Sequence, residues 1–226
     1  MEPETLNLPV LALRGLTVFP HTNLTFDVER RISMKALEVA METGQEIFLV
    51  TQREINVDKP TEQDLYTMGT ISRVTQILRL GQNSLRVMVE GGRRARLKRL
   101  WQLEPYLQGQ VETAEEPESV NHGPKTEALL RQTWSLFQDY AQLAGNVAEE
   151  VIAAALDCQE PGDLADLIAQ NIALRYDDKQ AILEELSPMV RLRKLNGFLA
   201  RERDVLGYQR QMEGKVRDEL AQQQRE

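Results

Sequence analysis

The sequence contains little of what most catalytic and metal centres are built from. Its 226 residues include one cysteine, Cys158, and two histidines, His21 and His122. A single cysteine excludes an internal disulfide and a multi-cysteine zinc site, and it fits a reducing compartment such as the cytoplasm. Neither histidine has a His, Cys or carboxylate at a ligand spacing such as HExxH. We therefore expect no metal and no cofactor in this chain.

Motifs that bind nucleotide or activate a nucleophile are also missing. No GxxxxGK(S/T) segment occurs, so ATP hydrolysis is not expected. The nearest glycine-rich stretch, Gly91-Gly92, lacks the spacing of a phosphate-binding loop and is expected to join two strands. Cys158 falls near the end of an alanine-rich helix without a neighbouring histidine, which favours an inert structural thiol. Composition alone leaves a Ser/Lys dyad open, but no serine stands on a sharp glycine-flanked turn, so this chain is not expected to be an enzyme.

The chain also lacks long apolar runs and an excess of positive charge. No stretch approaches the roughly 20 apolar residues of a membrane-spanning helix, and Pro9 and Arg14 interrupt the apolar character of the N-terminal segment, which has no signal-peptide pattern. We expect a soluble protein that is not exported. The net charge of −8 argues against general nucleic-acid binding, which needs Lys and Arg to neutralise phosphates. With 42% hydrophobic and 27% charged residues, the chain is typical of one large or two small globular domains.

Residues 1–112 show the period-two apolar pattern of a β-sheet. The pattern predicts strands near residues 8–13, 24–28, 46–51, 69–80, 84–90, 94–101 and 106–111. The turn at residues 81–83, Gly-Gln-Asn, predicts an antiparallel hairpin. A helix over Arg31–Thr43, stopped by Gly44, should cover one end of the curved sheet with a face made of Ile32, Ala36, Leu37, Ala40 and Met41.

The second part of the chain has the pattern of a helical bundle. Residues 113–125 combine acidic residues with two prolines and a glycine, which is the composition of a linker. Helical periodicity follows over residues 126–226, with Pro161 and Pro188 at helix starts and Asp177 as the expected cap of a short helix. No proline follows Pro188, so one helix of roughly 50 Å should end the chain and project from the bundle.

Two sets of apolar residues are candidates for binding surfaces. The first is the loop after the first predicted strand, with Leu16, Val18, Phe19 and Pro20; these residues either close the end of the barrel, the favoured interpretation, or form a binding patch. The second is a thin seam on the last helix, which would pair with a neighbouring chain and consists of Val205, Met212, Val216 and Leu220.

Polar candidates are weaker. The basic run Arg93–Arg99, followed by Trp101, suits nucleic acid, but its alternation favours a solvated strand face on which Arg94, Arg96 and Lys98 project together. His21 is interpreted as a solvated loop residue before a partner-contacting one.

Several segments resemble the N-terminal region of Lon-type ATP-dependent proteases. The opening LPVLALRGLTVFPH over residues 8–21 is the most specific of them. The resemblance continues through ALEVAM at 36–41, IFLVTQ at 47–52, DLYTMGTI at 64–71, and VMVEG with RAR at 87–96. The helical half matches more loosely, over residues 161–169, 178–180 and 216–226.

The resemblance implies an α+β fold: a β-rich, PUA-like pseudo-barrel with one helix, then an all-α bundle that ends in a long projecting helix. It also implies recognition of unfolded or damaged proteins, support of hexamer assembly, and delivery of substrates to ATPase and Ser/Lys protease domains, before which this sequence stops. A purely structural oligomerisation element and a standalone binding module are the alternatives. The substrate-contacting residues implied are Leu16, Val18, Phe19, Pro20, His21, Ile32 and Met34.

Overall fold

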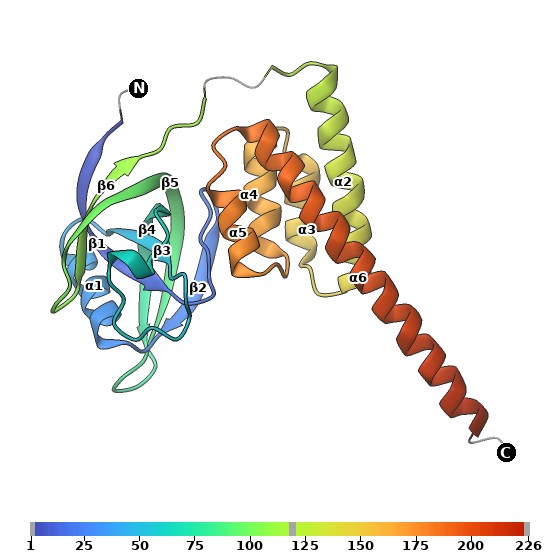
Figure 1. The fold of residues 1–226 in the computed structure, drawn as a ribbon, viewed down its shortest axis with the longest axis horizontal. Helices are drawn as coiled ribbons and strands as arrows, with labels where there is room; N and C mark the ends of the chain where they lie inside the picture. The colour runs from blue at the N-terminus through green and yellow to red at the C-terminus, as the bar shows by residue number, and fades with distance from the viewer. Residues whose placement is uncertain (1–2, 118–120, 224–226) are drawn as a thin grey trace.

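A six-stranded sheet and a group of five helices lie side by side, and the last helix extends beyond both (Figure 1). The computed structural model describes residues 3–117 and 121–223, and within the last helix it describes only the backbone of residues 218 and 220–223. The expected α+β class, with the strands first and the helical group second, is confirmed.

The strands form a ring with one extra strand at its side. They are β1 (Thr5–Leu13), β2 (Asn23–Val28), β3 (Glu46–Thr51), β4 (Met68–Arg79), β5 (Leu85–Gln102) and β6 (Leu107–Thr113). The order is β2-β5-β4-β3-β1-β6, and a further β5–β6 pairing closes the ring. Only the β1–β3 pair is parallel among the pairings of the described strands. The long strand β5 pairs with β2 along its first half and with β6 along its second half.

The β4–β5 hairpin predicted from the Gly-Gln-Asn turn is confirmed, with the Leu80 amide donating to the Ser84 carbonyl at 3.0 Å. The prediction that Gly91-Gly92 joins two separate strands is wrong, because β5 runs through both glycines with only a register shift against β4. A side chain at Gly91 would lie 2.0 Å from the Phe19 carbonyl oxygen. The glycine therefore marks a close approach of two backbones.

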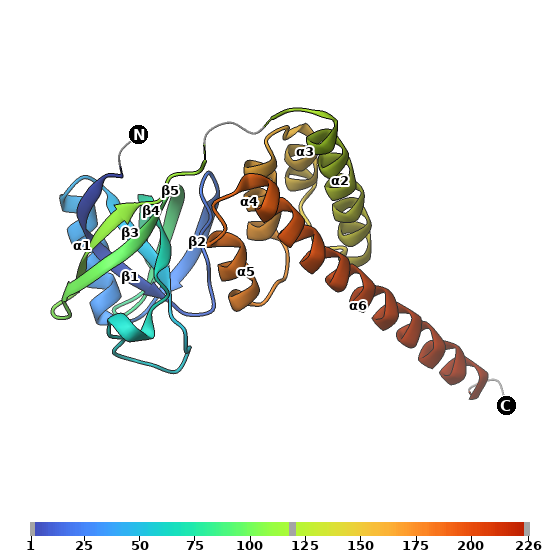
Figure 2. The ribbon, with the colours of Figure 1, turned by 45° about the horizontal axis from the view of Figure 1, so that its top comes forward.

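The helix inside the sheet region, α1 (Arg31–Glu42), lies on the side of the barrel away from the helical group (Figure 2). Ala36, Leu37 and Ala40 are buried against β1 and β3, as the spacing predicts. Met41 is 37% exposed and does not share that buried face, so this part of the prediction is wrong. The helix ends before Gly44, whose φ of 112° reverses the chain into β3.

The helical group consists of α2 (Pro124–Ala144), α3 (Glu149–Asp157), α4 (Pro161–Asn171), α5 (Tyr176–Leu183) and α6 (Pro188–Gln223); a single 3-10 turn, η1 (Glu62–Asp64), lies in the sheet part. Pro161 and Pro188 are the first residues of their helices, as predicted. The expected cap of α5 is wrong by two residues, since Arg175 is the N-cap and Asp177 lies in the first turn. The core of the group includes Phe137, Leu164, Ile168 and Leu195, each fully buried.

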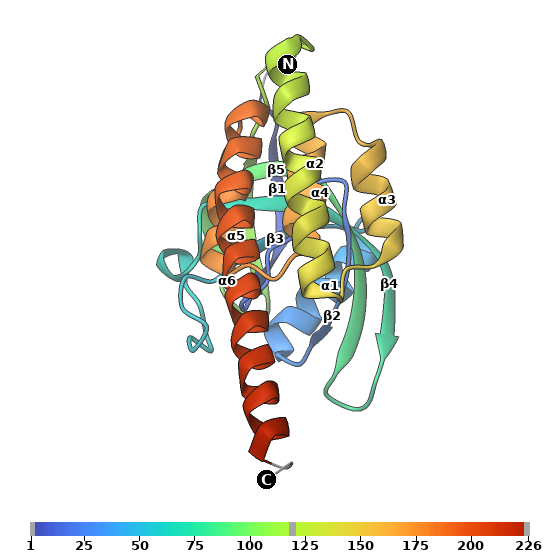
Figure 3. The same ribbon diagram turned by 90° about the vertical axis from the view of Figure 1, so that its right-hand side faces the viewer.

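The long helix α6 packs on α2 for part of its length and then extends alone (Figure 3). Arg210 donates to the Gln142 carbonyl near the end of α2, at 3.3 Å. Beyond Arg210, the remaining turns to Gln223 project for roughly 20 Å at 1.5 Å per residue. Within the described residues, none of the helices, α6 included, has the length and apolar character to cross a membrane.

Candidate functional site: the cleft beside α4 and the exposed apolar surfaces

The loop after β1, residues 14–22, lies between the sheet and the helical group. Val18 is 2% exposed, Phe19 is fully buried, and Pro20 is buried as well. Phe19 belongs to the apolar core of the helical group rather than to the barrel. These three residues therefore offer no exposed apolar surface, which corrects the expectation of a binding patch at this loop. Val18 packs in the barrel core with Leu11 and Leu37, so the favoured interpretation, closure of the barrel, is confirmed for that residue. Phe19 instead seals the sheet part against the helical group.

A single glutamine side chain of α4 binds the backbone of this loop at several points. The Gln170 Oε1 atom accepts from the Phe19 amide at 3.0 Å and from the Thr22 hydroxyl at 3.1 Å. Its Nε2 atom donates to the Thr17 carbonyl at 3.2 Å. Buried backbone groups need such partners, so Gln170 replaces the strand or water contacts that a free loop would have.

Four charged side chains meet next to this loop and form what we call the ion cluster: Arg94, Glu116, Asp166 and Arg191. Arg94 of β5 donates two hydrogen bonds to the Asp166 carboxylate of α4, at 2.6 and 2.8 Å. Arg191 of α6 donates to the same carboxylate at 3.2 Å, and Glu116 accepts from both arginines. The prediction that Arg94 lies on a solvated strand face is wrong, since its side chain is 2% exposed.

Three of the four side chains of the ion cluster are almost fully buried. The side chains of Asp166 and Arg191 are 3% and 0% exposed, and only Glu116, at 40%, reaches solvent. Burial raises the pKa of the Asp166 carboxyl, and the two guanidinium groups oppose that shift because they attract the charged form. Charges buried this deeply need one another, because an unpaired ion in such a site is costly.

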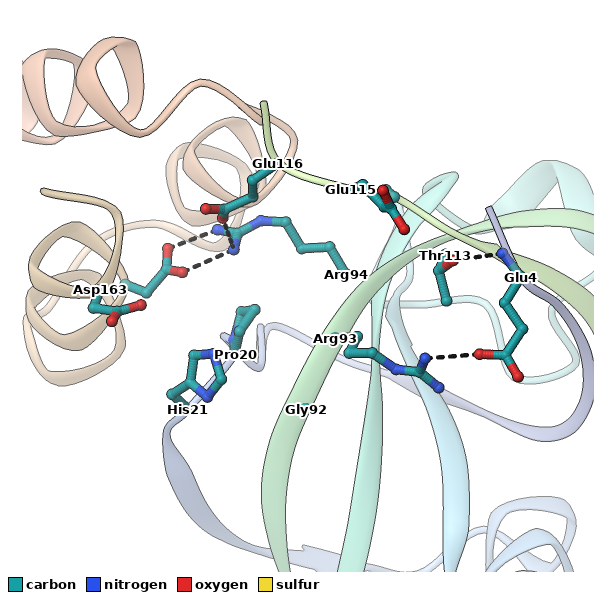
Figure 4. A pocket seen from close by; sticks show the side chains of 12 residues that line it. Glu4, Pro20, His21, Gly92, Arg93, Arg94, Thr113, Glu115, Glu116 and Asp163 are labelled. Atoms are coloured by element: carbon teal, nitrogen blue, oxygen red, sulfur yellow. Dashed lines mark hydrogen bonds and ion pairs between the residues drawn. The ribbon is translucent and has the colours of Figure 1, made fainter. Parts of the chain in front are cut away.

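A cleft of about 450 Å³ opens beside the ion cluster, between the sheet and α4 (Figure 4). The sheet side contributes Arg93, which is paired with Glu4 at 2.8 Å, and the loop contributes Pro20 and His21. Asp163, in the first turn of α4, faces them across the opening. The lining carries more carboxylates than guanidinium groups, so the cleft is acidic.

The other implied contact residues lie at several places. His21 is exposed at the cleft, with a left-handed φ of 56° and its amide donating to the Gly91 carbonyl. Leu16 is 37% exposed, beside Gly15 and Ile55. Ile32 and Met34 on α1 are half-buried, and Met34 lines a shallow hollow of about 220 Å³ between α1 and the hairpin turn. The structure does not bring these residues together into one surface.

Among the described residues, exposed apolar side chains gather instead on the β4–β5 hairpin, which sequence reasoning missed, on the free face of α6, and at the end of β5, where Trp101 and Leu103 are 48% and 46% exposed. Leu78, Leu80 and Met88 on the β4–β5 hairpin are 41–51% exposed, and we call them the hairpin patch. Leu78 and Met88 share the outward face of the hairpin, since Met88 pairs with Gln76, two residues from Leu78. The hairpin extends past the rest of the sheet (Figure 3).

The second place is the free face of α6. Val205, Tyr208, Met212 and Val216, 46–69% exposed, recur every three or four residues and form what we call the tail stripe. Three of them were expected from the sequence, Tyr208 was missed, and the Leu220 side chain lies outside the described residues.

Neither Cys158 nor His122 lies in surroundings that would activate it. Cys158 caps the C-terminal end of α3, where burial raises the pKa of its thiol and favours the unreactive protonated form. His122 lies 3.4 Å from Glu160, both more than half exposed. Across residues 3–117 and 121–223, no group of three or more His, Cys, Asp or Glu could hold a metal ion.

This arrangement, a closed strand ring sealed against a helical group with one projecting helix, defines a known class of structures. The N-terminal domain of a Mycobacterium avium complex Lon protease superposes with a TM-score of 0.68 at 22% identity, covering 86% of this chain and 98% of that one. The Lon N-terminal domain protein from Xanthomonas campestris does so with a TM-score of 0.59 at 18% identity, covering 84% and 96%. These matches show the fold.

Sequence comparison then gives the family. Residues 7–201 match the family model of the ATP-dependent protease La (LON) substrate-binding domain, and the chain belongs to this family. It is 38% identical over 226 residues to the Lon protease of Desulforamulus reducens and 35% identical over 220 residues to Lon protease 1 of Bacillus subtilis. These alignments cover 100% and 97% of this chain but 28% of each relative, so the chain spans about a quarter of their length. The resemblance found in the sequence is thereby confirmed.

Proposed function

We propose that this chain is the part of a cytoplasmic Lon protease that captures unfolded or damaged protein and passes it to ATPase and protease domains of the full-length enzyme. The hairpin patch supports this proposal, because three large apolar side chains on a protruding hairpin gain most from covering an apolar segment of another polypeptide. The chain itself is proposed to neither hydrolyse ATP nor cut peptide bonds. Residues 1–112 and 126–226 are proposed to be two domains joined by residues 113–125.

Removing apolar surface from the hairpin patch tests this function. We expect the Leu78→Ser, Met88→Ser double variant to bind a permanently unfolded protein, such as reduced and carboxymethylated α-lactalbumin, at least fivefold more weakly. Each serine removes apolar contact worth about 1 kcal/mol or more. The dissociation constant is measured by fluorescence anisotropy, and NMR shifts locate the contact on the unsubstituted chain.

The matched control is Leu156→Ser on α3, which removes a leucine that is 39% exposed and distant from the hairpin in the chain. Equal affinities of the double variant and the control would contradict the hairpin patch as the binding surface. Shift changes confined to Leu16, Ile32 and Met34 would instead support the residues that the family resemblance implied.

A second role, support of hexamer assembly, is favoured by the tail stripe. Four apolar side chains on an otherwise charged helix form a narrow seam of the kind that pairs with another helix. We propose that α6 pairs with a neighbouring chain along this seam.

We expect the Met212→Glu, Val216→Glu variant to sediment as a monomer at concentrations where the unsubstituted chain associates, because two buried carboxylates would replace apolar contacts. Analytical ultracentrifugation of both, and of a chain ending at Arg210 so that the α2–α6 contact remains, measures this. The control is Arg217→Glu, an exposed residue seven positions after Arg210 and on the side of the helix away from the tail stripe. Identical monomers in all four samples would contradict the proposed pairing.

A further inference from the structure

The ion cluster connects more of the chain than any other group of side chains at the cleft. Arg94 comes from β5, Glu116 from the segment after β6, Asp166 from α4, and Arg191 from the first turn of α6. We propose that the ion cluster is a latch that fixes the sheet to the base of α6, so that the two move as one rigid body. This inference concerns the mechanics of the chain and does not depend on what the chain binds.

The latch works because both arginines share the same carboxylates. If Arg94 left Asp166, the one remaining cation, Arg191, would face the two carboxylates of Asp166 and Glu116. A negative charge would then be unbalanced next to Asp166, whose side chain is 3% exposed. Arg94 is also held by its Nε atom, which donates to the Leu183 carbonyl at the end of α5 at 2.9 Å. Such multiply bonded guanidinium groups have a fixed orientation, because the planar donor fork accepts partners in few directions.

The segment between the two parts belongs to the latch, although its composition is that of a flexible linker. Ala114 is 8% exposed, and its amide donates to the Arg94 carbonyl at 2.9 Å. Two residues further on, Glu116 bonds to both arginines. Residues 114–116, at the start of the segment, are therefore bound to β5 and α6.

The orientation of α6 at the latch determines where its far end lies. Arg191 lies at the start of a continuous helix of 36 residues, and from Arg191 to Gln223 that helix reaches roughly 48 Å. A small rotation of the sheet about the cleft is therefore magnified at the projecting end of α6. The other polar contacts across the boundary include only neutral partners in the cases described: the three hydrogen bonds of Gln170 to the loop after β1, Gln180 Nε2 donating to the Met68 carbonyl at 2.9 Å, and the Tyr176 hydroxyl donating to the Arg53 carbonyl at 3.1 Å.

Spin-label distances in the full chain test the latch. In a Cys158→Ser background, labels at Gln76→Cys on β4 and Gln209→Cys on α6 report the separation of the two parts by pulsed EPR; both positions are exposed. We expect one narrow distance distribution without further changes. Arg94→Met should at least double the width of the distance distribution. It removes the side chain by which the sheet contacts the ion cluster and leaves the Asp166–Arg191 pair inside the helical group intact.

The control is Lys98→Met, four residues along the same strand, which removes an exposed pair with Glu112 and should leave the distribution unchanged. If circular dichroism shows that Arg94→Met does not fold, Asp166→Asn, which keeps the side-chain shape, is measured in its place and should broaden the distribution likewise. A broad distribution in the background chain, or a narrow one in the folded latch variant, would overturn the proposal.

Discussion

Replacing Asp166 with alanine is expected to lower the free energy of unfolding by about 3 to 5 kcal/mol, because it leaves two buried guanidinium groups with the half-exposed Glu116 as their one shared carboxylate in the ion cluster. Arg191 is fully buried and Arg94 nearly so, and water cannot easily replace the lost carboxylate. Urea unfolding followed by circular dichroism measures the change. A loss of this size should also lower the melting temperature by roughly 10 °C for a chain of this length.

A second variant distinguishes two free energies: the loss on removing one charge from the ion cluster, and the net contribution of the whole cluster to stability. We expect the triple replacement Arg94→Met, Asp166→Leu, Arg191→Met to be much less destabilised than Asp166→Ala alone, because no unpaired charge remains. The Arg86→Met variant is a surface control, since the Arg86–Asp27 pair is about half exposed and worth little. If Asp166→Ala were as harmless as Arg86→Met, the burial of the ion cluster would have to be wrong.

The ion cluster also shows which part of the site could be predicted from the sequence. The period-two pattern of β5 correctly put Arg94 and Ala95 on opposite faces, but the pattern cannot tell solvent from another domain as the neighbour of the charged face. In α4, Asp166 is buried beside Gly162 and Ala169, its neighbours at helical spacing, on a side of the helix away from Leu164 and Ile168. A carboxylate on a buried helix face requires a cationic partner, although its spacing does not say which arginine supplies it.

The fold itself was more accessible, because helices and strands follow from local periodicity. The positions of β3, α1 and the start of α6 were predicted to within a residue or two, since each has a clear apolar period or a proline at its start. The joining of residues 84–90 and 94–101 into one strand was missed, since two glycines usually end a strand. Only the approach of the Phe19 carbonyl explains Gly91, and that contact spans 72 residues of sequence.

The loop after β1 shows the same limit: the sequence predicts that its apolar residues are covered but not what covers them. Large apolar residues in a loop are expensive to expose, and this correctly predicts that something covers them. The covering surface is the helical core and Gln170, more than 140 residues away in the chain, so local pattern cannot identify it. Exposed side chains on the hairpin, by contrast, follow from strand alternation once the hairpin is known, and Leu78 and Met88 could have been found in that way.

Gly91→Ala is expected to cost roughly 3 kcal/mol of stability, because the new methyl group has no space. It would lie 2.0 Å from the Phe19 carbonyl oxygen and 2.9 Å from its carbon, and backbone atoms cannot move aside as a flexible side chain does. Two hydrogen bonds hold the strands at this approach, from the Gly91 amide to the Thr22 carbonyl and from the His21 amide to the Gly91 carbonyl, both 2.8 Å. Separation of the backbones would also draw the fully buried Phe19 out of the helical core.

Gly81→Ala in the hairpin turn is the matched control for Gly91→Ala, since its methyl group would meet nothing within 4 Å. We expect that variant to unfold within about 0.5 kcal/mol of the parent in urea, because an alanine without a clash mainly restricts the unfolded chain. The comparison decides between two interpretations of residues 16–20. A loop that merely displays apolar side chains would tolerate the displacement caused by Gly91→Ala, whereas a loop that seals the sheet to the helices would not. Equal stability of the two alanine variants would therefore restore the loop as a free binding surface and remove the seal on which the geometry of the cleft depends.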